Sequence, residues 1–249
     1  MWLATHYNVM TAGIVLSIAS LLCGSIILLI KDVQPNERET ITHELKMMGK
    51  DLWSMLKVPL SLFVIILILL PMGTGAATNL WSAIAGDWKT DADTVALVTG
   101  LLSGLIGGVG SILGGFVADK WGNWVAYLGS CILCALVTII MALLPYQPEV
   151  YIGGVLAYSF ALGLQNAAFS SVLLFAIGKK NAATKYSLLS SIGNIPVAYM
   201  TVFDGWAHDH YNSKFMLVAE AVVGIVFAGA CIVVLKRMMA KKLIPVTAE

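Results

Sequence analysis

Glu220 is the residue whose type most clearly allows chemistry, because it is a carboxylate well inside an apolar stretch, KFMLVAEAVVGI (214–225). A charge in a lipid bilayer is costly, so an intramembrane acid is by default a functional candidate. Glu220 could carry a proton or contact a cationic solute. The alternative is a neutral, hydrogen-bonded carboxyl near the membrane interface, since Glu220 comes only five residues after Phe215.

Four amide side chains are the next candidates. Gln165 and Asn166 lie in the middle of an apolar stretch beside small residues, while Asn79 and Asn194 are weaker candidates of the same kind. Amides in apolar helices either line a cavity for a polar ligand or bond one helix to another. The residue types leave both interpretations open.

Pro71, Gly73 and Gly75 interrupt the apolar stretch that ends near Asn79. A helix broken at membrane depth exposes backbone groups that bind a solute or act as a hinge. A simple kink is the alternative.

The stretch GGFVADKWGNW (114–124) places Asp119 and Lys120 between two apolar runs. A carboxylate here could accept bonds from the first amides of an adjacent helix or pair with a cation, and so latch one conformation. The alternative is that both charges only mark a cytoplasmic turn.

Two GxxxG patterns come just before this charged pair. They consist of Gly104 with Gly108 and of Gly110 with Gly114. In lipid, small residues let helix backbones approach to van der Waals contact, so the patterns predict close helix packing. A phosphate-binding loop is excluded, because neither GxGxxG nor GxxxxGK[ST] fits.

The composition predicts the elements that hold these residues. The 249-residue chain is 59% hydrophobic and 12% charged, with a mean hydropathy of +0.86, whereas soluble domains carry about 25% charged residues. We therefore expect an all-α, polytopic membrane helix bundle. Crossing a bilayer takes about 20 apolar residues, and seven stretches qualify: 9–30, 58–80, 95–117, 124–144, 150–178, 186–203 and 215–235.

The basic residues predict the orientation. Thirteen of the fifteen Lys and Arg residues fall in one set of alternating loops, and only Lys89 and Lys214 fall in the other. Because cytoplasmic loops are enriched in Lys and Arg, we expect the N-terminus outside and the C-terminus in the cytoplasm. The outer loops lean acidic and include Asp204 and Asp209. Nothing in this distribution favours a nucleic-acid partner.

The sequence also predicts a division of the chain. NERETITHELKMMGKDLWSMLK (36–57) has a capping box and apolar residues on one helical face, which favours an amphipathic helix on the inner membrane surface, or a helical linker between two bundles. The predicted parts are a first transmembrane helix, a cytoplasmic amphipathic linker, a six-helix bundle and a basic cytoplasmic tail, over 1–30, 31–57, 58–235 and 236–249.

Catalytic and metal chemistry find little support. Cys131 and Cys134 form a CxxC inside an apolar run, which favours packing over redox chemistry. His208 and His210, in the predicted outer loop 204–212, could titrate near neutral pH but lack a fixed metal-ligand spacing. No HExxH or GxSxG motif is present. We expect neither an enzyme nor a metal or other cofactor.

The loop 115–122 carries a recognisable family motif, formed by Gly115, Asp119, Lys120 and Gly122. It resembles the signature loop of the major facilitator superfamily, G-x-x-x-D-[RK]-x-G-[RK]-[RK], and departs from it at Asn123 and Trp124. In that family the loop joins the second and third helices of each six-helix half on the cytoplasmic side. The chain thus resembles the C-terminal half of such a transporter, preceded by one helix and the central loop.

Three further stretches resemble the AmpG-type branch, which carries muropeptides and includes acetyl-CoA-type carriers. They are PMGTGAATNLWSAIAGDW (71–88), LGLQNAAFSSVLLFAIGKK (162–180) and ATKYSLLSSIGN (183–194). The resemblance implies a permease of the bacterial inner membrane that moves a polar organic solute, such as a sugar–peptide, by alternating access around a central site. A proton gradient or the solute's own gradient would drive it.

A transporter of this kind has two halves. We therefore expect a fragment of a longer permease, one half of a split gene, or a homo-oligomer, so that a missing N-terminal half or a second copy is the partner. The alternative function is a non-transporting membrane assembly or sensor protein that keeps the helices.

Overall fold

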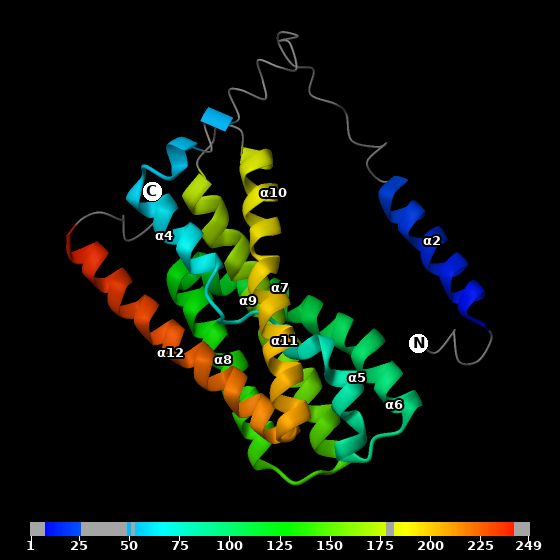
Figure 1. The fold of residues 1–249 in the computed structure, drawn as a ribbon. Coiled ribbons are helices and arrows are strands. Elements are labelled where there is room, and N and C mark those ends of the chain that lie inside the picture. The colour runs from blue at the N-terminus through cyan, green and yellow to red at the C-terminus, as the bar shows by residue number, and fades with distance from the viewer. Residues whose placement is uncertain (1–7, 26–48, 51–52, 178–181, 242–249) are drawn as a thin grey trace. The chain divides into compact units, whose positions relative to one another are not determined.

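The computed structural model describes residues 8–25, 49–50, 53–177 and 182–241, and the regular elements in these ranges are all helical. The chain divides into two compact units, 1–49 and 50–249. In the first unit, α2 (Val9–Ser25) is an apolar helix (Figure 1). Asn8 caps it by accepting a hydrogen bond from the backbone N–H of Thr11 at 2.7 Å. Most of the predicted amphipathic helix over 31–57 lies outside the described residues.

The second unit contains the helices α4 to α12, which Figure 1 labels, and the short helices η2, η3 and η4. They are α4 (Pro59–Ile68), η2 (Ala76–Asn79), α5 (Trp81–Ile84), η3 (Ala85–Trp88), α6 (Ala92–Ala96), the π-helical turn η4 (Leu97–Leu102), α7 (Ser103–Trp121), α8 (Asn123–Leu143), α9 (Pro148–Ile177), α10 (Ala182–Ile192), α11 (Asn194–His210) and α12 (Ser213–Ala240).

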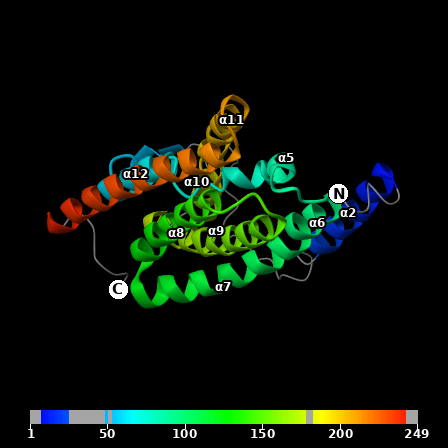
Figure 2. The same ribbon diagram turned by 90° about the horizontal axis from the view of Figure 1, so that it is seen from below.

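The long helices of this unit pack in layers. Helix α9 packs against both α7 and α8, and α12 packs against α8 and α11. Viewed from below, α7 and α12 lie on opposite sides of the α8–α9 pair (Figure 2). Helix α9 is thus covered on several sides and can hold polar groups in the interior of the unit.

Four helical segments are long and apolar enough to cross a membrane: 92–121, 123–143, 148–177 and 213–240. Residues 13–22 and 59–68 form shorter apolar helices. These segments confirm the predicted all-α, polytopic membrane bundle. The first long segment begins at α6, where Asp91 caps the helix by accepting bonds from the Thr94 hydroxyl at 2.7 Å and the Thr94 backbone N–H at 2.9 Å. These bonds lower the pKa of Asp91, the hydroxyl more than the N–H.

Two predicted spans differ from the observed helices. The span 58–80 is not one helix, because α4 ends at Ile68 and the chain becomes irregular before η2. The span 186–203 is part of a longer path, in which α10 and α11 follow one another with a turn at Gly193 (Figure 1). The prediction of an outer loop over 204–212 is wrong for 204–210, because α11 continues to His210. Hydropathy locates the apolar part of a helix and misses its polar end.

Helices α7 and α9 touch through glycine. A Cβ added at Gly163 would collide with the Gly107 carbonyl oxygen, and one added at Gly114 would lie 2.6 Å from the Leu164 carbonyl oxygen. The Ser111 hydroxyl bridges the two helices by donating to the carbonyls of Gly107 and Gly163, at 3.0 and 3.2 Å. Only the absence of side chains allows this backbone approach.

The two GxxxG patterns therefore behave differently. A Cβ at Gly110 would collide with the Phe160 carbonyl, so Gly110 and Gly114 lie at the contact, as predicted. A Cβ at Gly104 or Gly108 would meet nothing within 4 Å among the described residues. The α9-facing side of α7 runs through Gly107, Gly110 and Gly114, so the close packing predicted for Gly104 and Gly108 is not to α9 and stays a prediction.

We expect Gly163→Ala to destabilise the protein by about 1–3 kcal/mol, because the added methyl group overpacks a backbone–backbone contact. Gly108→Ala is the matched control, since its Cβ meets open space. Thermal unfolding of the two purified variants in detergent, followed by tryptophan fluorescence, measures the difference. Equal unfolding midpoints would show that the α7–α9 approach does not depend on glycine.

Candidate functional site

The four amides chosen from the sequence line one cavity of about 240 Å³, here called the amide cavity. Asn79 comes from the end of η2, Gln165 and Asn166 from the middle of α9, and Asn194 from the start of α11. The neighbouring wall includes Thr78, Tyr127, Phe169 and Ser190. Segments more than 100 residues apart in the sequence thus bring their polar side chains to one hollow.

The short helices after α4 are fixed against α9, and this fixes the position of Asn79. The Tyr151 hydroxyl donates to the Trp81 carbonyl at 2.9 Å, and the Trp81 ring meets the Tyr158 ring edge-on with centroids 5.4 Å apart. The Asn79 amide also donates to the Thr201 hydroxyl at 2.9 Å. Asn79 therefore bonds two elements together and lines the cavity, so the two interpretations left open by the sequence both apply to it.

The other three amides differ in their burial and in their hydrogen bonds within the protein. Gln165 is buried, with 5% of its surface exposed, whereas Asn166 is exposed. Asn194 donates to the Ser190 carbonyl one turn earlier, at 3.3 Å. Each of these side chains keeps acceptor capacity for a ligand, because an amide has two donor hydrogens and an oxygen with two lone pairs.

The wall beside these amides is the irregular segment between α4 and η2. Gly73 and Gly75 adopt the left-handed region, with φ of 60° and 74°, which favours glycine. A Cβ at Gly73 would lie 2.6 Å from Cys131 Sγ and 3.1 Å from Gln165 Cγ. The Tyr199 hydroxyl donates to the Leu69 carbonyl at 2.8 Å, so a carbonyl freed at the helix end has a partner. The segment is a true helix break, and the simple kink is excluded.

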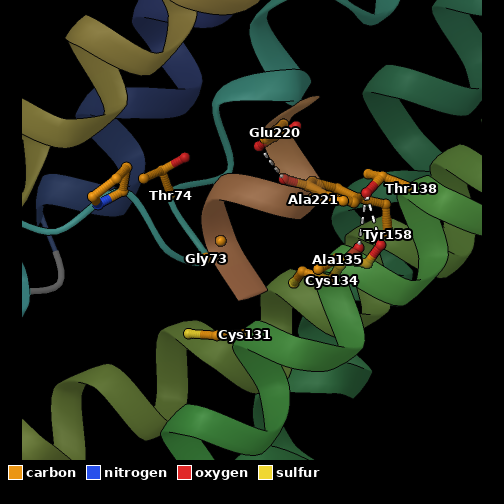
Figure 3. Close-up of a pocket in the computed structure, with 11 residues that line it drawn as sticks. Gly73, Thr74, Cys131, Cys134, Ala135, Thr138, Tyr158, Glu220 and Ala221 are labelled. Carbon is orange, nitrogen blue, oxygen red and sulfur yellow. Dashed lines mark hydrogen bonds between the residues drawn. The ribbon is translucent and has the colours of Figure 1, made fainter. Parts of the chain in front are cut away.

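Glu220 lies in a second, much smaller cavity, here called the acid chamber (Figure 3). The Tyr158 hydroxyl donates to Glu220 Oε1 at 3.2 Å, and Glu220 Oε2 is buried without a hydrogen-bond partner among the described residues. The chamber measures about 20 Å³, room for a single water-sized species, which needs about 10–15 Å³. Glu220 is therefore buried inside the helical unit, and its role stays a prediction.

The two cavities share a wall. Gly73 and Thr74 line the amide cavity on one side and the acid chamber on the other. Figure 3 shows both residues on the irregular segment, near the α12 helix that carries Glu220. A shift of this segment would therefore change both cavities together.

Asp204 is a second buried acid, although its sequence context predicts an outer loop. It lies on α11 with no exposed surface, and both carboxyl oxygens are buried without a hydrogen-bond partner in the described part of the chain. A helical pattern could have found it, because the buried face of α11 runs through Pro196, Met200, Asp204 and Ala207.

Asp87 on η3 contacts both His208, near the end of α11, and Ser213, at the start of α12. His208 Nε2 lies 3.7 Å from Asp87 Oδ2, and His208 Nδ1 lies 3.4 Å from Asp209 Oδ1. The Ser213 hydroxyl at the start of α12 also donates to Asp87. His210 does not join this group and contacts the Trp206 carbonyl instead. Across the described ranges, no group of three or more His, Cys, Asp or Glu side chains could hold a metal ion.

A neighbouring contact fixes the connection between α8 and α9. Lys214 Nζ donates to the Leu144 carbonyl at 2.7 Å and lies 4.5 Å from the centre of the Tyr146 ring. The pKa of Tyr146 is raised, first by partial burial and then by the charge of Asp87.

The turn between α7 and α8 is a single residue, and Asp119 and Lys120 lie in the last turn of α7. Helix α7 ends at Trp121 and α8 begins at Asn123, with Gly122 between them at a φ of 89°. Asp119 and Lys120 are exposed, and Lys120 Nζ lies 5.9 Å from the centre of the Trp121 ring. A Cβ at Gly115 would meet open space. The latch proposed for Asp119 has no partner within the described residues and stays a prediction.

The model of the Major Facilitator Superfamily matches residues 1–201, which is most of the chain. The chain belongs to the major facilitator superfamily. No curated protein matches it.

Members of the major facilitator superfamily are membrane transporters of small-molecule solutes and not enzymes. The family and the apolar helices together make this chain an integral membrane protein of a transporter family. The helices of the second unit can be grouped along the chain into six consecutive segments. These are α4 to η3, α6 to α7, α8, α9, α10 to α11, and α12. The amide cavity and the acid chamber both lie among these segments.

Proposed function

We propose that the chain is the C-terminal half of a secondary transporter that moves a polar organic solute by alternating access, with the amide cavity as its solute site. The single observation that carries this proposal is the convergence of Asn79, Gln165, Asn166 and Asn194 on one hollow beside a broken helix. Binding sites of secondary transporters commonly use discontinuous helices, whose free backbone groups and hinges serve the transport cycle.

The proposed complete permease includes a second half. An N-terminal six-helix half, or a second copy of this chain, would close the cavity from the other side. Asp119 would form its latch with that half at the cytoplasmic surface. We place the protein in the bacterial inner membrane with its N-terminus outside, because the basic residues favour that orientation.

The resemblance to the AmpG-type branch supports a sugar–peptide as one candidate solute, and Glu220 is the candidate carrier of a coupling proton. The buried position of Glu220 supports this role, since an acid inside a membrane segment has a cost that function usually explains.

Substitution of the cavity amides tests the proposed site. We expect Gln165→Ala or Asn194→Ala to lower uptake by the complete permease about 3- to 10-fold, because each removes one or two neutral hydrogen bonds worth about 0.5–1.5 kcal/mol. Uptake of a panel of labelled polar solutes, anhydromuropeptides included, into cells or proteoliposomes measures the effect.

Gln147→Ala is the matched control, because Gln147 is an exposed amide side chain outside the cavity. Full uptake by both cavity variants would move the solute site elsewhere. Insertion of the complete permease without uptake of any solute would favour the non-transporting assembly or sensor protein.

A further inference from the structure

The lining of the amide cavity is polar without being charged. Its hydrogen-bonding side chains are the four amides together with the hydroxyls of Thr74, Thr78, Ser190 and Tyr127. No Asp, Glu, Lys, Arg or His lines it among the residues that the structure describes. The cavity therefore offers several donors and acceptors, and no countercharge.

The charged groups buried in the same unit, Asp204 included, do not line the amide cavity. Glu220 lines the acid chamber and accepts from Tyr158 at 3.2 Å. Lys185, which is 8% exposed, donates to the Ile177 carbonyl at 3.3 Å. Neither side chain lines the amide cavity, so neither is placed to neutralise a solute there.

A lining without charged side chains disfavours the binding of an ionic group. Removing a charge from water without a paired countercharge costs several kcal/mol, even after relaxation of the protein. A neutral hydroxyl or amide costs far less free energy to remove from water, and hydrogen bonds to the cavity lining offset that cost. A phosphate, carboxylate or ammonium group in this cavity would therefore bind much more weakly than a neutral group of the same shape.

The cavity also has an apolar face. Tyr127 and Phe169 lie side by side with ring centroids 6.0 Å apart, and Leu162, Ile68 and Leu70 complete this face. The volume of about 240 Å³ is below the roughly 300–1,000 Å³ of pockets that hold drug-sized ligands. The shape suits one small ring with polar groups on its edge and an apolar face.

We propose that the group bound in the amide cavity is an uncharged, polyhydroxylated ring of sugar size. The inference rests on the proposed function, because it takes the amide cavity to be the solute site. It goes further by assigning the chemical class of the group held by this chain and by excluding an ionic group from that position.

Matched solutes that differ mainly in charge test the proposal. The complete permease in lipid nanodiscs is titrated calorimetrically with the neutral sugars D-glucose, D-galactose and N-acetylglucosamine. Their charged ring counterparts are glucuronate, galacturonate and glucosamine. We expect at least one neutral sugar to bind, and its charged counterparts to bind at least tenfold more weakly. Gln165→Ala should weaken the neutral binding, and Gln147→Ala should leave it unchanged.

Two results would overturn the proposal in distinguishable ways. Tighter binding of a charged counterpart, lost in Gln165→Ala, would keep the amide cavity as the solute site and contradict the neutral class. Binding of a neutral sugar that is indifferent to both Gln165→Ala and Asn194→Ala would contradict the proposed site itself. If none of the neutral sugars binds to the folded complete permease with an intact unfolding transition, the sugar-like class is wrong.

Discussion

Replacing Gly73 by alanine is expected to reduce uptake by the complete permease at least tenfold. Gly73 has a φ of 60°, a conformation that costs an L-residue about 1–2 kcal/mol. The new Cβ would also lie 2.6 Å from Cys131 Sγ and 3.1 Å from Gln165 Cγ. The substitution would thus displace side chains that line the acid chamber and the amide cavity. Initial uptake rates measure the loss of transport.

Two companion variants separate the causes. Gly229→Ala is the matched control, because its Cβ would meet nothing within 4 Å and Gly229 lines neither cavity. Cys131→Ala removes the nearest clashing atom, so the double variant with Gly73→Ala should regain part of the lost uptake. Normal uptake by Gly73→Ala alone would show that the segment between the two cavities tolerates displacement and has no part in transport.

The second large effect is expected at Glu220. Glu220→Gln keeps a side-chain oxygen for the Tyr158 hydroxyl but cannot take up and release a proton. We expect it to abolish proton-driven accumulation, by at least about tenfold. It should preserve exchange of labelled for unlabelled solute across the membrane, a reaction that needs no net proton movement.

Accumulation and exchange are compared in proteoliposomes with and without an imposed pH gradient. Glu149→Gln is the control, because Glu149 is an exposed acid away from the acid chamber. Accumulation by Glu220→Gln at the wild-type level would leave Glu220 a structural carboxyl that is neutral in the membrane. Loss of both accumulation and exchange would assign Glu220 to solute binding or folding rather than to coupling.

The fold class could be predicted because bilayer insertion depends mainly on composition. Stretches of about 20 apolar residues were sufficient to indicate α7, α8, α9 and α12. Gln165 and Asn166 could be proposed as candidate site residues for the same reason, since they stand out against an apolar background. Their meeting with Asn79 and Asn194 could not be predicted, because it depends on which helices are neighbours.

The differences between prediction and structure have a physical cause in common. Hydropathy predicts Asp204 in a loop because it treats any acid as a surface group, whereas the helical spacing from Met200 to Ala207 puts Asp204 on a buried face of α11. Similarly, the GxxxG pattern at Gly104 and Gly108 matched a packing motif, but helix rotation turns Gly107 toward α9 instead. Local patterns identify the residue types, and tertiary packing decides which of them meet.

Protection of an introduced thiol by solute tests most directly whether the amide cavity is the solute site. Asn166→Cys places an exposed thiol in the cavity wall, while the native Cys131, Cys134 and Cys231 are buried. Labelling of the complete permease with N-ethylmaleimide, corrected for the parent protein, gives the rate with and without the transported solute, and Gln147→Cys is the control. We predict that saturating solute slows labelling at position 166 at least about fivefold and leaves position 147 unchanged. Equal labelling rates at position 166 with and without solute would contradict the assignment of this cavity as the transport site.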